Sequence, residues 1–99
     1  MAKFLYLYHG GNAPASPEEG QKVMQAWMAY FGRVGPKLVD GGAPLAASRA
    51  VKGAPNSSAT GYSIIEAASL DDAEGMTDGH PHLMSGGSIE ICEVLPIPM

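Results

Sequence analysis

The sequence predicts a single α+β domain, and three observations lead to that prediction. Two segments carry helix start signals, and four short runs of β-branched, aromatic and aliphatic residues surround them as expected strands. The chain of 99 residues is long enough for one hydrophobic core and too short for two. The expected order is strand, helix, strand, strand, helix, strand, over residues 3–9, 17–34, 45–51, 60–67, 69–76 and 88–94. This order is typical of a ferredoxin-like fold, in which an antiparallel sheet carries two helices on one face.

The helix predicted over residues 17–34 has the clearest signals. Ser16 is a favoured N-cap residue, Pro17 suits the first helical position, and Glu19 stands where a capping-box acid reaches back. An apolar stripe follows at helical spacing and consists of Val23, Trp27, Tyr30 and Val34, with Met24, Met28 and Phe31 beside it. A glycine and a proline at positions 35 and 36 end the helix.

The remaining elements are separated by turn-forming residues. Turns are expected at residues 40–44 and 53–59, where glycine, proline, asparagine and serine gather on either side of the Ala-rich strand 45–51. Ser69 caps the second helix, and two acidic residues follow it at the positive end of that helix.

The expected strands have no consistently polar face, which predicts that both faces of the sheet are covered. Successive side chains point to opposite faces, so only one apolar set can lie under the helices. We expect that set to be Leu5, Leu7, Ile65, Ile89 and Ile91. The other set is Tyr6, Tyr8, Tyr62, Ile64, Cys92 and Val94. A second copy of the chain is the simplest cover for this other face, so we expect a homodimer through the sheet.

Composition excludes several classes of protein. The net charge is −4 and the six basic residues are scattered singly, so the clustered positive charge of a nucleic-acid-binding surface is absent from the sequence. No stretch approaches the roughly 20 apolar residues of a membrane span, and residues 1–4 do not resemble a signal peptide. The single cysteine, Cys92, fits a reducing compartment and a small buried side chain. A cytoplasmic protein without nucleic-acid or membrane partners is expected.

The chain resembles the YCII-related, or DGPF-domain, proteins, which are small ferredoxin-like proteins that form dimeric α/β barrels. The resemblance covers nearly the whole chain. It rests on the opening strand 3–7, the helix that contains Trp27, the turn 40–45, and the ending that runs from His80-Pro81-His82 through Gly86-Gly87-Ser88-Ile89-Glu90-Ile91. The turn has the sequence Asp-Gly-Gly-Ala-Pro-Leu where the family has Asp-Gly-Pro-Phe, and the segment 17–34 has no histidine. The resemblance implies a small-molecule protein, and in some members a lyase-type or dehalogenating enzyme that uses a His and Asp pair.

The candidate catalytic residues are Asp40, the aspartate that matches the family's turn, and His80. A carboxylate can hold an imidazole in one tautomer, and an imidazole can move protons near neutral pH. The candidate substrate-binding residues are Tyr6, Tyr8, His9, Trp27, Tyr62 and His82. The plainer interpretations are a turn aspartate, a polar loop residue or helix cap at His80 and His82, and core packing for the aromatic residues. A metal site would need three or four ligands, for which only His9, His80, His82 and Asp40 come into question, and it is the weaker interpretation.

Two hypotheses about function follow. One is a cofactor-independent lyase or isomerase that uses an Asp/His acid-base pair on an unidentified small molecule. The other is a non-catalytic dimeric module that binds a metabolite or a protein. Neither hypothesis needs a cofactor, and fold analogy carries much of the first one.

Overall fold

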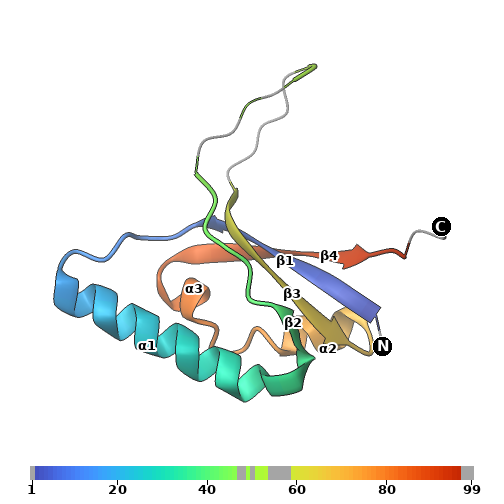
Figure 1. Ribbon diagram of the computed structural model, residues 1–99, viewed down its shortest axis with the longest axis horizontal. Coiled ribbons are helices and arrows are strands. Elements are labelled where there is room, and N and C mark those ends of the chain that lie inside the picture. Colours follow the sequence, from blue (N-terminus) through green and yellow to red (C-terminus); the bar gives the residue numbers. More distant parts are fainter. Residues whose placement is uncertain (1, 47–48, 50, 54–58, 97–99) are drawn as a thin grey trace.

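The computed structural model describes residues 2–46, 49, 51–53 and 59–96. Its elements are β1 (Ala2–Gly10), α1 (Pro17–Val34), the 3-10 turn η1 (Gly35–Lys37), β2 (Leu38–Asp40), β3 (Ala59–Ala67), α2 (Leu70–Gly75), α3 (Pro81–Met84) and β4 (Gly87–Val94). The four strands form one antiparallel sheet in the order β2-β3-β1-β4. The helices lie together on one side of this sheet (Figure 1). The structure is therefore a small α+β fold consistent with the ferredoxin-like class.

Helix α1 begins and ends where its local chemistry predicts. The Ser16 side chain accepts a hydrogen bond from the backbone N–H of Glu19, and the Glu19 carboxylate accepts one from the backbone N–H of Ala15. At the other end, Gly35 has φ of 60°, a left-handed conformation in which glycine meets no Cβ penalty. The buried side of α1 includes Tyr30 and Val34. Met24 and Met28, expected beside the apolar stripe, are instead 66% and 67% exposed.

The second strand lies earlier in the chain than the sequence predicts. The edge strand of the sheet is β2, directly after η1, and it pairs with β3. Within the expected strand 45–51, residues 47, 48 and 50 lie outside the described residues, and the described ones form no strand. Pro44 makes only an isolated bridge to Gly61. Alanine has weak strand propensity, whereas Leu38 and Val39 supply the larger side chains that an edge strand packs.

The alternation in β1 has the opposite phase to the expected one. Phe4, Tyr6 and Tyr8 are buried under the helices, whereas Leu5 and Leu7 lie half-buried on the open face of the sheet. The expected facing of Tyr6 and Tyr8 is therefore wrong. The physical reason is size matching across the β1·β3 pair, because Tyr8 lies opposite Gly61 and Tyr6 opposite Ser63. Two large rings on the covered face are accommodated because the neighbouring strand offers two small residues there.

The facing of the other two long strands agrees with expectation. Ile65 is buried on the helix side, where Ile89 and Ile91 pack against the same core. Alternation in β3 and the register of β4 with β1 place the remaining apolar set on the open face, and it consists of Tyr62, Ile64 and Cys92 together with Leu5 and Leu7. These side chains are half-buried, and no helix of the described chain covers them.

Buried tyrosine hydroxyls join the sheet to the helices. The Tyr6 hydroxyl donates a hydrogen bond to the backbone carbonyl of Ala73 in α2. The Tyr30 hydroxyl donates to the carbonyl of Met76, which follows α2, at 2.8 Å. Burial raises the pKa of both phenols, so they remain protonated donors at neutral pH. Each ring thus contributes apolar area to the core and satisfies a helix carbonyl at the same time.

No helix in the described part of the chain is long and apolar enough to cross a membrane.

Candidate functional site

A cavity of about 360 Å³ lies at the end of the sheet where β1 and β3 meet the segment after β2. One wall is aromatic and comes from β1 and α1. Another wall is backbone, because it is built from glycines and small residues. The lining residues are Tyr8, Trp27, Phe31, Gly41, Gly42, Ala43, Pro44, Thr60, Gly61, Tyr62 and His82. None of them carries a permanent charge, so the cavity favours an uncharged, partly apolar ligand.

Glycine is required at two places in the backbone wall. Gly42 has φ of 76°, and a Cβ there would lie 1.7 Å from the carbonyl oxygen of Tyr62. The Asp40 carboxylate holds this turn, since its Oδ1 accepts a hydrogen bond from the Gly42 N–H at 2.8 Å. Gly61 lies on the covered face of β3, and a Cβ there would come within 3.3 Å of the Tyr8 ring. The missing side chain at Gly61 leaves the space that the cavity occupies.

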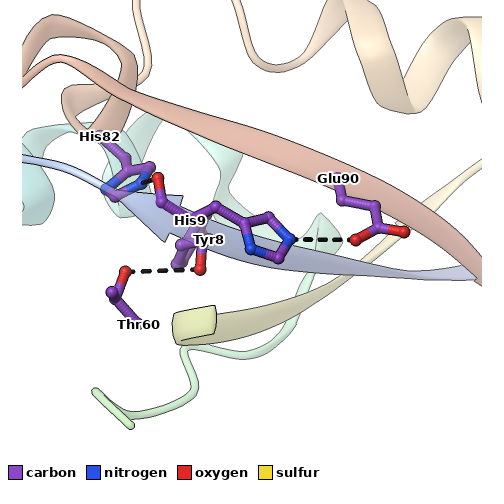
Figure 2. Close-up of polar contacts among 5 residues, drawn as sticks. All are labelled: Tyr8, His9, Thr60, His82 and Glu90. Carbon is purple, nitrogen blue, oxygen red and sulfur yellow. Dashed lines mark hydrogen bonds and ion pairs between the residues drawn. The ribbon is translucent and has the colours of Figure 1, made fainter. Parts of the chain in front are cut away.

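His82 is the imidazole that lines the cavity, and the fold holds its ring tightly. His82 Nε2 lies 2.9 Å from the backbone carbonyl oxygen of His9 (Figure 2). A Cβ at Gly87 would lie 2.2 Å from this Nε2, and one at Gly11 would lie 2.9 Å from Cε1, so the ring fits only because both neighbours are glycine. A carbonyl can only accept, so Nε2 carries the proton and Nδ1 of the neutral ring is left as an acceptor.

The free nitrogen of His82 reaches accessible space. Nδ1 makes no hydrogen bond to any described residue. Among the described residues, every fully buried side-chain nitrogen or oxygen has a hydrogen-bond partner. Nδ1 must therefore be accessible, in a residue that is only 9% exposed overall and lines the cavity. The Tyr8 ring packs beside it, with the two ring centres 5.0 Å apart. This arrangement offers a ligand one proton acceptor of fixed tautomer next to an aromatic wall.

His80 lies behind the cavity and is fully buried, with 0% of its surface exposed. Its Nδ1 accepts a hydrogen bond from the backbone N–H of His82 at 3.1 Å and thereby caps the short helix α3. Its Nε2 lies 3.1 Å from the Tyr8 hydroxyl oxygen. Burial, with smaller contributions from the charges of His82 and Arg33, lowers the pKa of His80 to about 4. At neutral pH this imidazole is therefore uncharged and has no open nitrogen.

The structure brings together some of the predicted site residues and separates others. Tyr8, Trp27 and His82 line the cavity. Tyr62 also lines it, next to Gly42, although the alternation of β3 directs its side chain to the open face of the sheet. Tyr6 is in the core at 0% exposure, and the His9 ring lies on the open face of the sheet, 3.0 Å from the Glu90 carboxylate (Figure 2). Asp40 is exposed in its turn, and no hydrogen bond or ion pair joins it to His80 in the described part of the chain.

Sequence reasoning missed the backbone wall and the helix that places His82. Helix α3 has four residues, too few for any periodicity to show. Its signal was the proline at position 81, which suits the first position of a helix that begins after a capping His80. Among the described residues, no three histidine, cysteine, aspartate or glutamate side chains gather to hold a metal ion.

A second, more open cleft of about 320 Å³ lies near the end of α1. It is lined by Arg33, Val34, Lys37, Gly75, Met76 and Asp78. Arg33 donates a hydrogen bond to the Asp78 carbonyl and stacks over the Tyr30 ring. These contacts give Arg33 a structural role that joins α1 to the segment after α2.

Comparison with known proteins places the fold. No protein-family model matches the chain, and no curated protein matches it. A solved structure does match, that of 5-chloro-2-hydroxyhydroquinone dehydrochlorinase from Burkholderia phenoliruptrix AC1100 in complex with 2,5-dihydroxybenzoquinone. The two chains are 21% identical, the match covers 92% of this chain and 90% of the other, and the TM-score is 0.55.

The likeness shows a shared fold. That neighbour is a dehydrochlorinase with a YCII-like fold, which supports the family resemblance at the level of architecture.

Proposed function

We propose that the cavity binds a small, flat, uncharged ring that carries hydroxyl groups, and that His82 is the general base that acts on it. The observation that carries this proposal is the geometry of His82. Its Nε2–H is held by the His9 carbonyl, so Nδ1 is the nitrogen left to accept a proton, in a residue that lines a cavity with aromatic walls.

The walls favour the ring-shaped ligand. Tyr8, Trp27 and Phe31 line the cavity and offer ring faces and edges to a planar molecule. Opposite them, backbone at Gly41, Gly42 and Gly61 allows close approach without side chains in the way. The absence of permanently charged lining residues disfavours carboxylates and phosphates. The fold neighbour is named for an oxygenated ring compound and has another one bound, which supports the same class of ligand.

The proposed chemistry is a lyase-type elimination. His82 Nδ1 takes the proton of a ring hydroxyl, and the electron pair left on that oxygen moves into the ring. The ring carbon that bears the leaving group takes up a proton from solvent, and the leaving group departs with its bonding electrons. A second hydroxyl proton is lost as the quinone forms, so a chlorinated hydroquinone loses one proton and one chloride in total and gives a quinone. The base returns its proton to solvent afterwards.

Asp40 and His80 take other parts in this proposal than the acid-base pair expected from the sequence. Asp40 holds the turn that forms the backbone wall, and His80 stands behind Tyr8 with both ring nitrogens engaged. The proton acceptor in this proposal is His82, the histidine that lines the cavity.

The test uses Trp27, the only tryptophan of the chain, as a fluorescent reporter in the cavity wall. Hydroquinone should quench it saturably, whereas benzoate should not. Chloride release from 5-chloro-2-hydroxyhydroquinone should be detectable above the rate in buffer and should fall at least about 100-fold in His82→Gln, the scale of a lost general base. The control is Lys22→Gln, at an exposed position of α1 that lines neither cavity. Absence of hydroquinone binding would refute the proposal, and binding without chloride release would leave a non-catalytic binding module.

A further variant moves the base without changing its chemistry. Gly87→Ala places a methyl group 2.2 Å from the present position of His82 Nε2, so the ring must shift. We expect chloride release to fall as it does in His82→Gln, while hydroquinone still binds because the aromatic wall is intact.

We also propose that two copies pair through the open face of the sheet. The face presents half-buried Leu5, Leu7, Tyr62, Ile64 and Cys92, which no described helix covers. Apolar side chains on an uncovered sheet face favour a partner surface, and a two-fold pairing of identical sheets would cover them with the same residues of the second copy.

A further inference from the structure

A chain of hydrogen bonds runs from His82 through the core to the backbone wall of the cavity. The backbone N–H of His82 contacts His80 Nδ1, and His80 Nε2 contacts the Tyr8 hydroxyl. The Tyr8 hydroxyl in turn contacts Ser63 Oγ at 2.8 Å, and Ser63 Oγ contacts the carbonyl of Gly41 at 2.9 Å.

The two ends of this series of hydrogen bonds determine which atom donates in each bond. A backbone N–H can only donate, so His80 Nδ1 is an acceptor and the single proton of the neutral ring is on Nε2. A backbone carbonyl can only accept, so Ser63 donates to Gly41 and must itself accept from Tyr8. Tyr8 therefore accepts from His80. No other placement of the protons satisfies all four bonds.

These hydrogen bonds connect the elements that surround the cavity. The series starts at α3, which carries His82, and passes through β1 at Tyr8 and β3 at Ser63. It ends at Gly41, directly after β2 and within the backbone wall. His80 joins α3 to β1 in this network, because one of its ring nitrogens holds the His82 N–H and the other holds the Tyr8 hydroxyl.

The surroundings of His80 keep it in place. Four aromatic rings surround it, with centres at 4.2 Å for Tyr30, 4.9 Å for Trp27, 5.2 Å for Tyr8 and 6.2 Å for Tyr6. These rings pack around the imidazole, and the apolar environment opposes a charged imidazole.

We infer that His80 is the positioning residue of the cavity: as an Nε2-protonated imidazole, it holds the His82 backbone with one nitrogen and the Tyr8 hydroxyl with the other. It does not carry protons to a ligand. The purpose of this positioning rests on the proposed function, whereas the order of the hydrogen bonds stands on the structure alone. Tyr8, saturated by His80 and Ser63, then offers the ligand its ring and not its hydroxyl.

Nitrogen-15 NMR of histidine-labelled protein tests the tautomer without any ligand. His80 should show a protonated Nε2 and an unprotonated Nδ1, unchanged between pH 7.5 and 5.5, with an Nε2–H that exchanges slowly with water. In Tyr8→Phe the tautomer should persist, because the His82 N–H still holds Nδ1, but the Nε2–H signal should shift and exchange faster. A His80 that does not donate to Tyr8 would keep the exchange rate of its ring N–H when the Tyr8 hydroxyl is removed. An Nδ1-protonated ring, or a ring that titrates in this pH range, would overturn the inference.

The positioning role is tested by binding. In His80→Asn the side-chain oxygen can still cap α3 but cannot reach Tyr8, so hydroquinone should bind about fivefold more weakly, the effect of one lost neutral hydrogen bond. The control Lys22→Asn, at an exposed position of α1 that lines neither cavity, should bind as the unmodified protein does. Unchanged hydroquinone affinity in folded His80→Asn would refute the positioning role. If the unmodified protein binds no hydroquinone while the NMR signature is present, the proposed function fails and the tautomer assignment stands.

Discussion

The burial of His80 predicts a specific loss of stability in mild acid. The pKa of His80 is lowered from 6.5 to about 4 in the folded chain, whereas in the unfolded chain it returns to the ordinary value. Between these two values the unfolded state binds more protons than the native state, so the free energy of unfolding falls as the pH falls through this window. The full effect is about 3 kcal/mol at pH 4 and below, and about 2 kcal/mol is already lost by pH 5.

The variant His80→Asn isolates this effect, since it removes the buried imidazole and retains a side chain that can cap α3. Urea unfolding of both proteins, followed by Trp27 fluorescence, gives the free energy of unfolding at pH 7.5, 6 and 5. The unmodified protein should be the more stable of the two at pH 7.5, and its advantage should shrink by about 2 kcal/mol at pH 5. Equal m-values in the two proteins serve as the control for compactness. A difference that stays constant with pH would refute the account of His80 as a buried neutral imidazole.

Three further predictions test the fold and the proposed assembly. Ser16→Ala should lower the free energy of unfolding by about 1 kcal/mol in urea titrations, because the Glu19 N–H loses its cap; an unchanged midpoint would contradict that role. Gly32→Ala should raise it by up to about 1 kcal/mol, because the new Cβ in α1 meets nothing within 4 Å; a lower melting temperature would show a contact that the structure lacks. Ile64→Asp should turn a dimer into a monomer in sedimentation at tens of micromolar, and sedimentation of the unmodified protein as a monomer would sink the proposed pairing.

Local chemistry made much of the fold predictable from the sequence. The bounds of α1 agree with expectation because its cap serine, first-turn proline and terminal glycine act within a few residues of each other. The cap at Ser69 is confirmed for the same reason, since its side chain accepts a hydrogen bond from the Asp72 N–H. The position of β4 also follows from its own alternation.

The phase of β1 could not be predicted from β1 alone, because both of its faces are apolar. What decides the phase is the partner strand, which has Gly61 and Ser63 on the face where Tyr8 and Tyr6 need space. The pairing of large with small residues across β1 and β3 was the available signal, but it requires the register to be known first.

Several residues of the candidate site could be predicted from the sequence, but their arrangement in space could not. Tyr8, Trp27, Tyr62 and His82 line the cavity, whereas sequence proximity gave no means of telling His80 from His82. The two histidines are separated by one proline, yet one caps a helix from inside the core and the other reaches the cavity. That difference arises from the glycines at positions 11 and 87, which leave room for only one of the rings.

A proton–nitrogen NMR titration of the protein with hydroquinone locates the proposed binding site in the cavity beside His82. Saturable shifts are expected at the Trp27 indole, at the Gly61 amide and at the His82 ring, with little change at Arg33 in the second cleft or at Cys92 on the open sheet face. Shifts that gather at Arg33 or Cys92 and spare Trp27 and Gly61, or no saturable shifts at all, would contradict it.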